Sequence, residues 1–274
     1  MQPVNESLRS LGIQPSDSAF NALALLPKAE RERIVNRLTA RQLTDLQWDW
    51  RVRARPNQLP PDGGWARWVL RAGRGFGKTR TGTHWFHERA MAQPGRWMAL
   101  VAKTPAEARN SNIDGPGGIK NIRPDERPVY QFGIRRLTWP NGSYATVYSD
   151  EEPESLRSFS GDTAWLDEFG KFKNAKECWD NLAFGMRERS NDKPRIVIST
   201  TPRPLPILIQ IEDMPGTVVT TGSSHDNRDN LAEEWYRDNI SIYEGTRFGR
   251  QEIHAEIMLD VPGALWTIDN LDAN

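Results

Sequence analysis

The chain has 274 residues, enough for one large or two modest domains with an ample core. Basic and acidic residues balance at 36 each, which argues against a permanently tight nucleic-acid coat protein but allows transient binding of DNA through a local patch. We expect no membrane-spanning segment and no signal peptide. The one cysteine, Cys178, excludes an internal disulfide, suits a reducing cytoplasm and is expected to fill the core.

The N-terminal quarter of the chain is predicted to be mainly helical. Residues 1–20 are polar and indicate a loose tail or a short helix, whereas residues 23–55 carry apolar side chains at helical spacing. A Pro/Gly-rich joint at residues 56–64 follows. Four tryptophans lie just before or after this joint, where packing in the core is the expected role: Trp48, Trp50, Trp65 and Trp68.

Strands and helices then alternate along the chain. Apolar strands are expected at 68–70, 96–103, 163–166, 195–200 and 217–223, and helices at 81–92, 175–189 and 231–255. This order predicts an α/β fold with a mainly parallel sheet and helices on both faces. The segments PVYQF, GIRRLTW and SYATVYS predict short strands, the last two joined by a hairpin turn at Asn141-Gly142, which would add antiparallel strands at one edge.

The run VLRAGRGFGKTRTG, residues 69–82, reads as a strand, a glycine-rich turn and a helix start. Glycines at 73, 75 and 77 allow the backbone N–H groups to approach phosphate oxygens closely, with help from the positive end of the helix. Lys78 would reach the β- and γ-phosphates, and the Thr79 hydroxyl would hold Mg²⁺. Ala72 stands where the usual pattern begins with glycine; the alternative is a chance glycine-rich turn.

An apolar strand at 163–166 runs into Asp167 and Glu168. A phosphate loop needs such a pair, because one carboxylate orders Mg²⁺ through its water shell and the other polarises the attacking water. We assign Asp167 to the metal and Glu168 to the catalytic base; a solvated acidic loop is the alternative.

Three hydroxyl residues, Ser199, Thr200 and Thr201, close the next buried strand. The carboxyl edge of an open α/β sheet is where ligands bind, so these hydroxyls would sense the γ-phosphate and pass its loss to a neighbouring segment. A helix N-cap before Pro202 is the simpler alternative.

Two arginines compete to stabilise the charge that develops on the γ-phosphoryl group. Arg74 lies in the glycine-rich loop and would act within its own chain. Arg157, in PESLRSFSG, would act in the same chain or reach a neighbouring subunit. Each is a surface arginine in the alternative interpretation.

The histidines give no metal site by their spacing. His84 and His87 lie at i, i+3 on the helix after the loop, where a packing or solvated role is expected. Residues 225–230, HDNRDN, are interpreted as a surface loop, with a metal or DNA contact as the alternative.

The motifs GRGFGKTRTG (73–82), ESLRSFSGDTAWLDEF (154–169) and ISTTPRP (198–204), in this order, resemble the ATPase domain of the tailed-bacteriophage terminase large subunit, a DNA-packaging motor. The resemblance covers roughly residue 40 onward and implies a P-loop NTPase fold of the RecA/ASCE-like type. It divides the chain into an N-terminal tail and helical lid (1–55), a P-loop ATPase core (56–255) and a linker toward an absent nuclease domain (256–274).

By matching position, the resemblance implies ATP and Mg²⁺ as cofactors, with Thr79 and Asp167 at the metal, Glu168, Arg74 and Arg157 in catalysis, and Ser199, Thr200 and Thr201 in coupling. The residues expected to contact the nucleotide are Gly73, Arg74, Gly75, Phe76, Gly77, Lys78, Thr79, Arg80 and Gln58, the last as an adenine contact.

The resemblance also implies the partners: double-stranded viral DNA, the portal protein, the small terminase subunit and further copies of the chain in a ring on the portal. The protein would act in the host cytoplasm and on the procapsid portal, and would be absent from the mature virion. No nuclease activity is expected from this chain. Two other functions stay open, a helicase-like ATPase acting on nucleic acid and a nucleotide-gated scaffold that does not turn over ATP.

Overall fold

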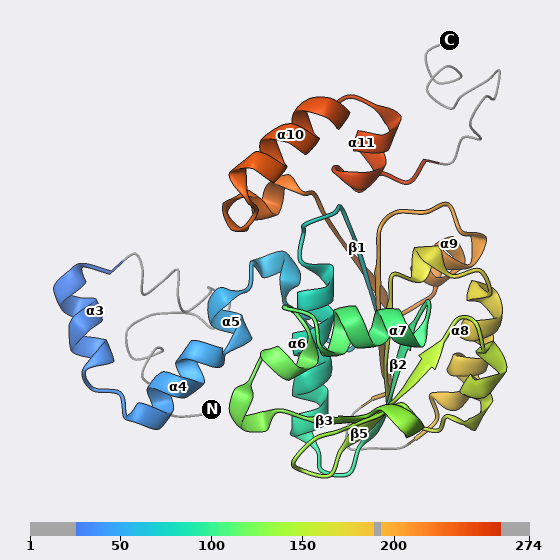
Figure 1. Cartoon of the computed structure of the whole chain (residues 1–274), viewed down its shortest axis with the longest axis horizontal. Helices are drawn as coiled ribbons and strands as arrows, with labels where there is room; N and C mark the ends of the chain where they lie inside the picture. The colour runs from blue at the N-terminus through green and yellow to red at the C-terminus, as the bar shows by residue number, and fades with distance from the viewer. Residues whose placement is uncertain (1–25, 189–192, 259–274) are drawn as a thin grey trace.

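A computed structural model describes residues 26–188 and 193–258. Within these residues the chain folds around an eight-stranded sheet with the order β3-β4-β5-β2-β6-β7-β1-β8 (Figure 1). Six strands are parallel: β1 (Arg67–Ala72), β2 (Trp97–Ala102), β5 (Tyr144–Ser149), β6 (Thr163–Asp167), β7 (Arg195–Thr200) and β8 (Thr217–Gly222). The expected antiparallel edge consists of β3 (Val129–Gln131) and β4 (Arg136–Thr138). The α/β prediction is therefore confirmed.

The central strands are apolar on both sides because helices cover both faces of the sheet. Along β1, Trp68 and Leu70 join one buried cluster and Val69 joins the other, as the alternation of side chains in a strand requires. Helix α6 (Lys78–Ala92) packs on the first face, and α8 (Ala175–Gly185) and α9 (Pro206–Asp213) pack on the second (Figure 1).

Two helical segments flank the sheet (Figure 1). The first comprises α3 (Lys28–Val35), α4 (Ala40–Trp48) and α5 (Trp50–Arg53), and Trp50 stacks on His84 of α6 with ring centroids 4.3 Å apart. The second comprises α10 (Glu233–Tyr243) and α11 (Arg247–Glu252). Shorter turns complete the fold: α7 (Pro105–Glu107), a π-helical turn (Ala108–Ile113), and 3-10 turns at Pro56–Gln58, Ile119–Asn121, Pro124–Glu126, Phe132–Ile134, Pro153–Ser158, Phe169–Lys171 and His225–Asn230.

Several element boundaries differ from the sequence prediction. Helix α6 begins at Lys78 rather than at residue 81. The preceding residue, Gly77, has a left-handed backbone with φ 98° and is the last residue of the loop. The strand expected over GIRRLTW shrinks to β4, since a 3-10 turn and Arg135 at φ 50° occupy its start. The long helix at 231–255 is broken between α10 and α11 by Gly245 at φ 76°.

The core roles expected for single residues are confirmed except for Trp48, which is only partly buried. Trp50, Trp65, Trp68 and Cys178 are buried, and burial raises the pKa of the Cys178 thiol to about 12. None of the helices in the two described ranges is both long and apolar enough to cross a bilayer. The predicted tail at 1–20 and all but the first residues of the linker at 256–274 lie outside the described residues.

Candidate functional site

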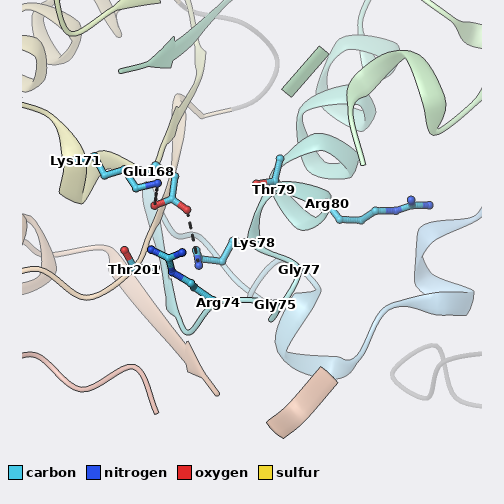
Figure 2. Close-up of a pocket in the computed structure, with 9 residues that line it drawn as sticks. All are labelled: Arg74, Gly75, Gly77, Lys78, Thr79, Arg80, Glu168, Lys171 and Thr201. Atoms are coloured by element: carbon cyan, nitrogen blue, oxygen red, sulfur yellow. Dashed lines mark ion pairs between the residues drawn. The ribbon is translucent and has the colours of Figure 1, made fainter. Parts of the chain in front are cut away.

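A cavity of about 340 Å³ opens at the carboxyl ends of the neighbouring strands β6, β7 and β1 (Figure 2). Open α/β sheets bind ligands at this edge. The cavity brings together residues from three separate stretches of sequence: Arg74, Gly75, Gly77, Lys78, Thr79, Arg80, Glu168, Lys171 and Thr201.

The loop between β1 and α6 depends on its glycines for two different reasons. Gly75 and Gly77 have φ of 75° and 98°, a region that side chains disfavour. Gly73 is needed for close approach, because a Cβ there would lie 2.5 Å from the carbonyl oxygen of Ile253. The loop leads into the first turn of α6, whose N–H groups have no acceptors within the helix and suit an anion.

Lys78 is almost fully buried in this loop, with 7% of its surface exposed. Its Nζ donates to the carbonyl oxygens of Ala72 and Gly73, at 2.9 and 3.0 Å, and lies 4.0 Å from Glu168 Oε1. Burial lowers the pKa of Lys78, and the charges of Glu168 and Asp167 oppose that shift. A buried ammonium that faces an open cavity is suited to bind an anionic group.

Asp167, the last residue of β6, is fixed by two donors. Ser199 Oγ donates to its Oδ1 at 2.5 Å and Asn112 Nδ2 donates to its Oδ2 at 2.7 Å. Burial, followed by repulsion from Glu168, raises the pKa of Asp167 to about 6. The sequence prediction missed Asn112, which lies in a π-helical turn outside the three sequence motifs.

Glu168 follows with a left-handed backbone, φ 53° and ψ 42°, which is uncommon for a side chain of this size. Its carboxylate lies between two lysines, since Oε1 is 4.0 Å from Lys78 Nζ and Oε2 is 3.4 Å from Lys171 Nζ (Figure 2). Oε2 is buried and forms no hydrogen bond within the described residues. Glu168 also lines the cavity, so its carboxylate can accept a proton from a ligand or water there. Lys171 was also missed; its i+3 spacing from Glu168 was the available signal.

The hydroxyl residues that end β7 connect the two halves of the site. Thr200 Oγ1 accepts from the backbone N–H of Gly170 at 2.9 Å and donates to the carbonyl oxygen of Thr201 at 2.6 Å. Thr201 itself lines the cavity. Ser199 binds Asp167, so the end of β7 contacts both the acidic pair and the turn that follows it.

Arg74 lines the cavity, and the structure pairs it with a residue from the C-terminal helical segment. Its Nε donates to Glu252 Oε2 at 2.7 Å, and this hydrogen bond and charge raise the pKa of Arg74. Glu252 is buried and also lies 3.8 Å from Arg203. The sequence offered no signal for Glu252.

Arg157 lies elsewhere. It is exposed on the 3-10 turn Pro153–Ser158, bonds Glu154 at 2.7 Å, and does not line the cavity.

Gln58 lies behind the loop rather than in the cavity. Its Nε2 donates to the Phe76 carbonyl oxygen at 3.3 Å, and its Oε1 accepts from the Arg55 backbone N–H at 3.2 Å. Arg55 also donates to the Phe76 carbonyl oxygen and stacks on the Phe76 ring. Arg80 contributes to the cavity wall, but its side chain extends away from Glu168 (Figure 2).

The loop between β1 and α6, and an acidic pair two strands away across β7, define a P-loop NTPase fold of the RecA/ASCE-like type. More closely, the chain belongs to the family described as terminase large subunit, T4likevirus-type, N-terminal, which matches residues 69–272. It is therefore a terminase large-subunit ATPase domain by family. No curated protein sequence matches the chain significantly.

Solved structures of phage terminases share the fold at low sequence identity. The ATPase domain of the Thermus phage P74-26 large terminase has a TM-score of 0.55 at 18% identity, over 71% of this chain and 90% of that domain. The large terminase of the thermophilic bacteriophage D6E in complex with ADP has a TM-score of 0.60 at 14% identity, over 80% of this chain and 54% of that protein. The HK97 bacteriophage large terminase has a TM-score of 0.53 at 15% identity, over 71% of this chain and 47% of that protein.

Proposed function

We propose that this chain hydrolyses ATP and that hydrolysis drives double-stranded viral DNA into a procapsid. The observation that carries the proposal is that Lys78 and Glu168 both line the cavity, with the buried Lys78 ammonium 4.0 Å from Glu168 Oε1. The D6E large terminase has been solved with ADP and with ATP-gamma-S, which supports nucleotide binding by this chain.

The residues fit a magnesium nucleotide. Thr79 offers a hydroxyl at the start of α6, and Asp167 offers a buried carboxylate that two donors hold in place. Bound Mg²⁺ would neutralise charge on the phosphate oxygens and raise the electrophilicity of the γ-phosphorus. The pKa of Asp167, raised to about 6, is explained by burial beside Glu168 without a cation, so a divalent ion nearby would favour its ionised form.

Glu168 acts as the base in this proposal. Its carboxylate, which lines the cavity, orients the attacking water and accepts its proton, while Lys78 neutralises charge on the phosphate oxygens. Arg74 is the arginine available from the same chain, once it leaves Glu252. Arg157 is exposed, which suits a role at the site of a neighbouring subunit in a ring.

Coupling to movement runs through the end of β7. Loss of the γ-phosphate changes what Thr201 and Glu168 contact, and the bond between Thr200 and Gly170 joins their segments. A shift there would move a helical segment or a neighbouring subunit that grips DNA. Portal protein, small terminase subunit and a ring of copies on the portal complete the proposed assembly in the host cytoplasm.

The first test is phosphate release from Mg·ATP by the wild-type chain and by Lys78→Ala. We expect turnover in the wild type and a loss of at least about 100-fold in the variant, because an electrostatic stabiliser of the phosphates is removed. Lys173→Ala, a nearby lysine outside the cavity wall, is the matched control and should keep full turnover.

Wild-type protein that binds ATP tightly without turnover would instead support the nucleotide-gated scaffold. The DNA step is measured by nuclease protection of DNA packaged into procapsids that carry the full assembly. Lys78→Ala should protect no DNA. ATP turnover without protection by the wild type would favour the helicase-like alternative.

A further inference from the structure

A cluster of two histidines and a glutamate lies outside the cavity, on the C-terminal helical segment. His225 follows β8 in the turn His225–Asn230, Glu244 caps the end of α10, and His254 follows α11. The three ligand atoms, one from each side chain, all lie within 4.8 Å of one another. The fold thus brings side chains from three separate segments close enough to contact one ion.

The separations approach those of a tetrahedral metal site. His254 Nε2 is 2.7 Å from Glu244 Oε1, and His225 Nε2 is 3.7 Å from Glu244 Oε2. Ligands about 2.0–2.1 Å from a tetrahedral zinc ion are themselves about 3.3 Å apart. Small side-chain movements would bring all three atoms into contact with one ion.

Tyr236 of α10 supports the orientation of His225. Its hydroxyl oxygen lies 2.5 Å from His225 Nδ1, so the other ring nitrogen, Nε2, is directed at Glu244. Histidines that bind metals usually donate the second ring N–H to such an outer partner, which fixes the tautomer and the ring plane.

We propose that His225, Glu244 and His254 bind one Zn²⁺ ion, with water in the fourth position. Two imidazoles and one carboxylate suit a borderline-soft transition metal better than Mg²⁺, which prefers six oxygen ligands. The three side chains are between 31% and 46% exposed, so an ion can enter from solvent. In the metal-free form His254 donates its Nε2 proton to Glu244, and the ion takes the place of that proton.

A metal ion at this site would stabilise the loop between β1 and α6. Next to His225, Ser224 Oγ donates to the Arg74 carbonyl oxygen at 2.6 Å, and its N–H donates to the Ile253 carbonyl oxygen at 2.9 Å. Two residues before His254, the Glu252 carbonyl oxygen accepts from the Arg74 N–H at 2.7 Å. An ion that ties His225 to His254 therefore joins the two segments that hold the loop, independently of whether ATP is hydrolysed.

The test is Zn²⁺ binding by protein without a histidine tag, measured by competition with a chromophoric chelator and by metal content after dialysis. We expect one equivalent bound at micromolar free Zn²⁺ and none of Mg²⁺. Glu244→Gln and His254→Gln should each weaken binding by more than the roughly 10- to 100-fold loss typical of an outer partner, and Tyr236→Phe by about 10-fold. Glu234→Gln, an exposed position on α10, is the matched control and should bind like the wild type.

A second measurement uses the wild-type protein alone, so its result does not depend on whether a variant folds. Zn²⁺ should slow amide hydrogen exchange over residues 224–254 in the wild-type protein, and Mg²⁺ should leave it unchanged. Two results would overturn the proposal: a wild-type chain that holds less than one Zn²⁺ with unchanged exchange, or folded Glu244→Gln and His254→Gln proteins that bind as tightly as the wild type.

Discussion

The protein itself supplies the hydrogen-bond acceptors of the Lys78 ammonium group. Its Nζ donates to two loop carbonyl oxygens and faces Glu168 at 4.0 Å. Phosphate oxygens would compete for this ammonium group, while Glu168 would keep its ion pair with Lys171. At the scale of single residues, the proposed function therefore links nucleotide binding and preparation of the base through one ammonium group.

The two arginines can be separated by substitution. Arg74→Ala should lower turnover of the isolated chain, whereas Arg157→Ala should leave it unchanged and lower turnover only in assembled rings. The expected loss is on the order of 1,000-fold where the arginine acts on the transferred phosphoryl group. Phosphate release, measured on the isolated chain and on assembled motors, checks both.

The opposite pattern would contradict these assignments. A loss with Arg157→Ala in the isolated chain would place that arginine in its own site, despite its exposed pairing with Glu154.

At the scale of elements, the end of β8 supports the loop after β1. The Gly222 carbonyl oxygen accepts from the Gly73 N–H at 2.9 Å, and the buried Phe76 ring lies directly against Gly222. The loop is thus held from β8 as well as from the segments around Ser224 and Glu252.

Gly222→Ala tests this support. The new Cβ would lie 2.1 Å from Phe76 Cε2, and Phe76 is fully buried, so the loop must shift. We expect a loss of about 1–3 kcal/mol in the free energy of unfolding, as for other overpacked sites, and weaker ATP binding. Denaturant unfolding and a nucleotide-binding titration measure the two effects.

Gly133→Ala is the control, because nothing lies within 4 Å of a Cβ there. It should change stability by less than about 0.5 kcal/mol. Equal stability of both variants would show that Phe76 does not fix the loop.

At the scale of the whole molecule, the buried Asp167 makes stability depend on pH. Burial and Glu168 raise the pKa of its carboxyl group from 3.8 to about 6, so the folded protein retains a proton that the unfolded chain has lost. Stability from this group is therefore highest below about pH 4 and falls as the pH rises to about 6, by about 3 kcal/mol for a shift of this size.

The measurement is urea unfolding between pH 4 and 7, without Mg²⁺ or nucleotide, for the wild type and Asp167→Asn. The difference between the two proteins should change across this window. The comparison is needed because burial lowers the pKa of His84 to about 3, which acts in the opposite direction over an overlapping range. Parallel curves would contradict the raised pKa of Asp167.

The sequence predicted those parts of the candidate site that are short motifs directly after an apolar strand. The glycine loop, the acidic pair and the hydroxyls after β7 each follow an apolar strand, and parallel strands bring their carboxyl ends to one edge of the sheet. The sheet and its antiparallel edge were predictable for the same reason, from strand periodicity and the Asn141-Gly142 turn.

Tertiary packing brings the remaining residues to the site or its supporting loop. No sequence motif around these residues marks them for that role. Asn112 comes from a π-helical turn, Glu252 from α11, and Arg55 from the chain just before the 3-10 turn Pro56–Gln58. The sequence left a metal contact open for residues 225–230, but it gave no sign of Glu244 or His254, because the three residues have no recognisable ligand spacing.

The most direct test of the central claim is a single-turnover comparison of the wild type with Glu168→Gln, using Mg·ATP. Glutamine keeps the size of the side chain but cannot take the proton from water, so we expect ATP affinity to stay within a few-fold while hydrolysis falls by about 100-fold or more. Glu107→Gln, an exposed glutamate outside the cavity, should match the wild type. Unchanged hydrolysis by Glu168→Gln would contradict the account, because the carboxylate beside Lys78 would then not be the base.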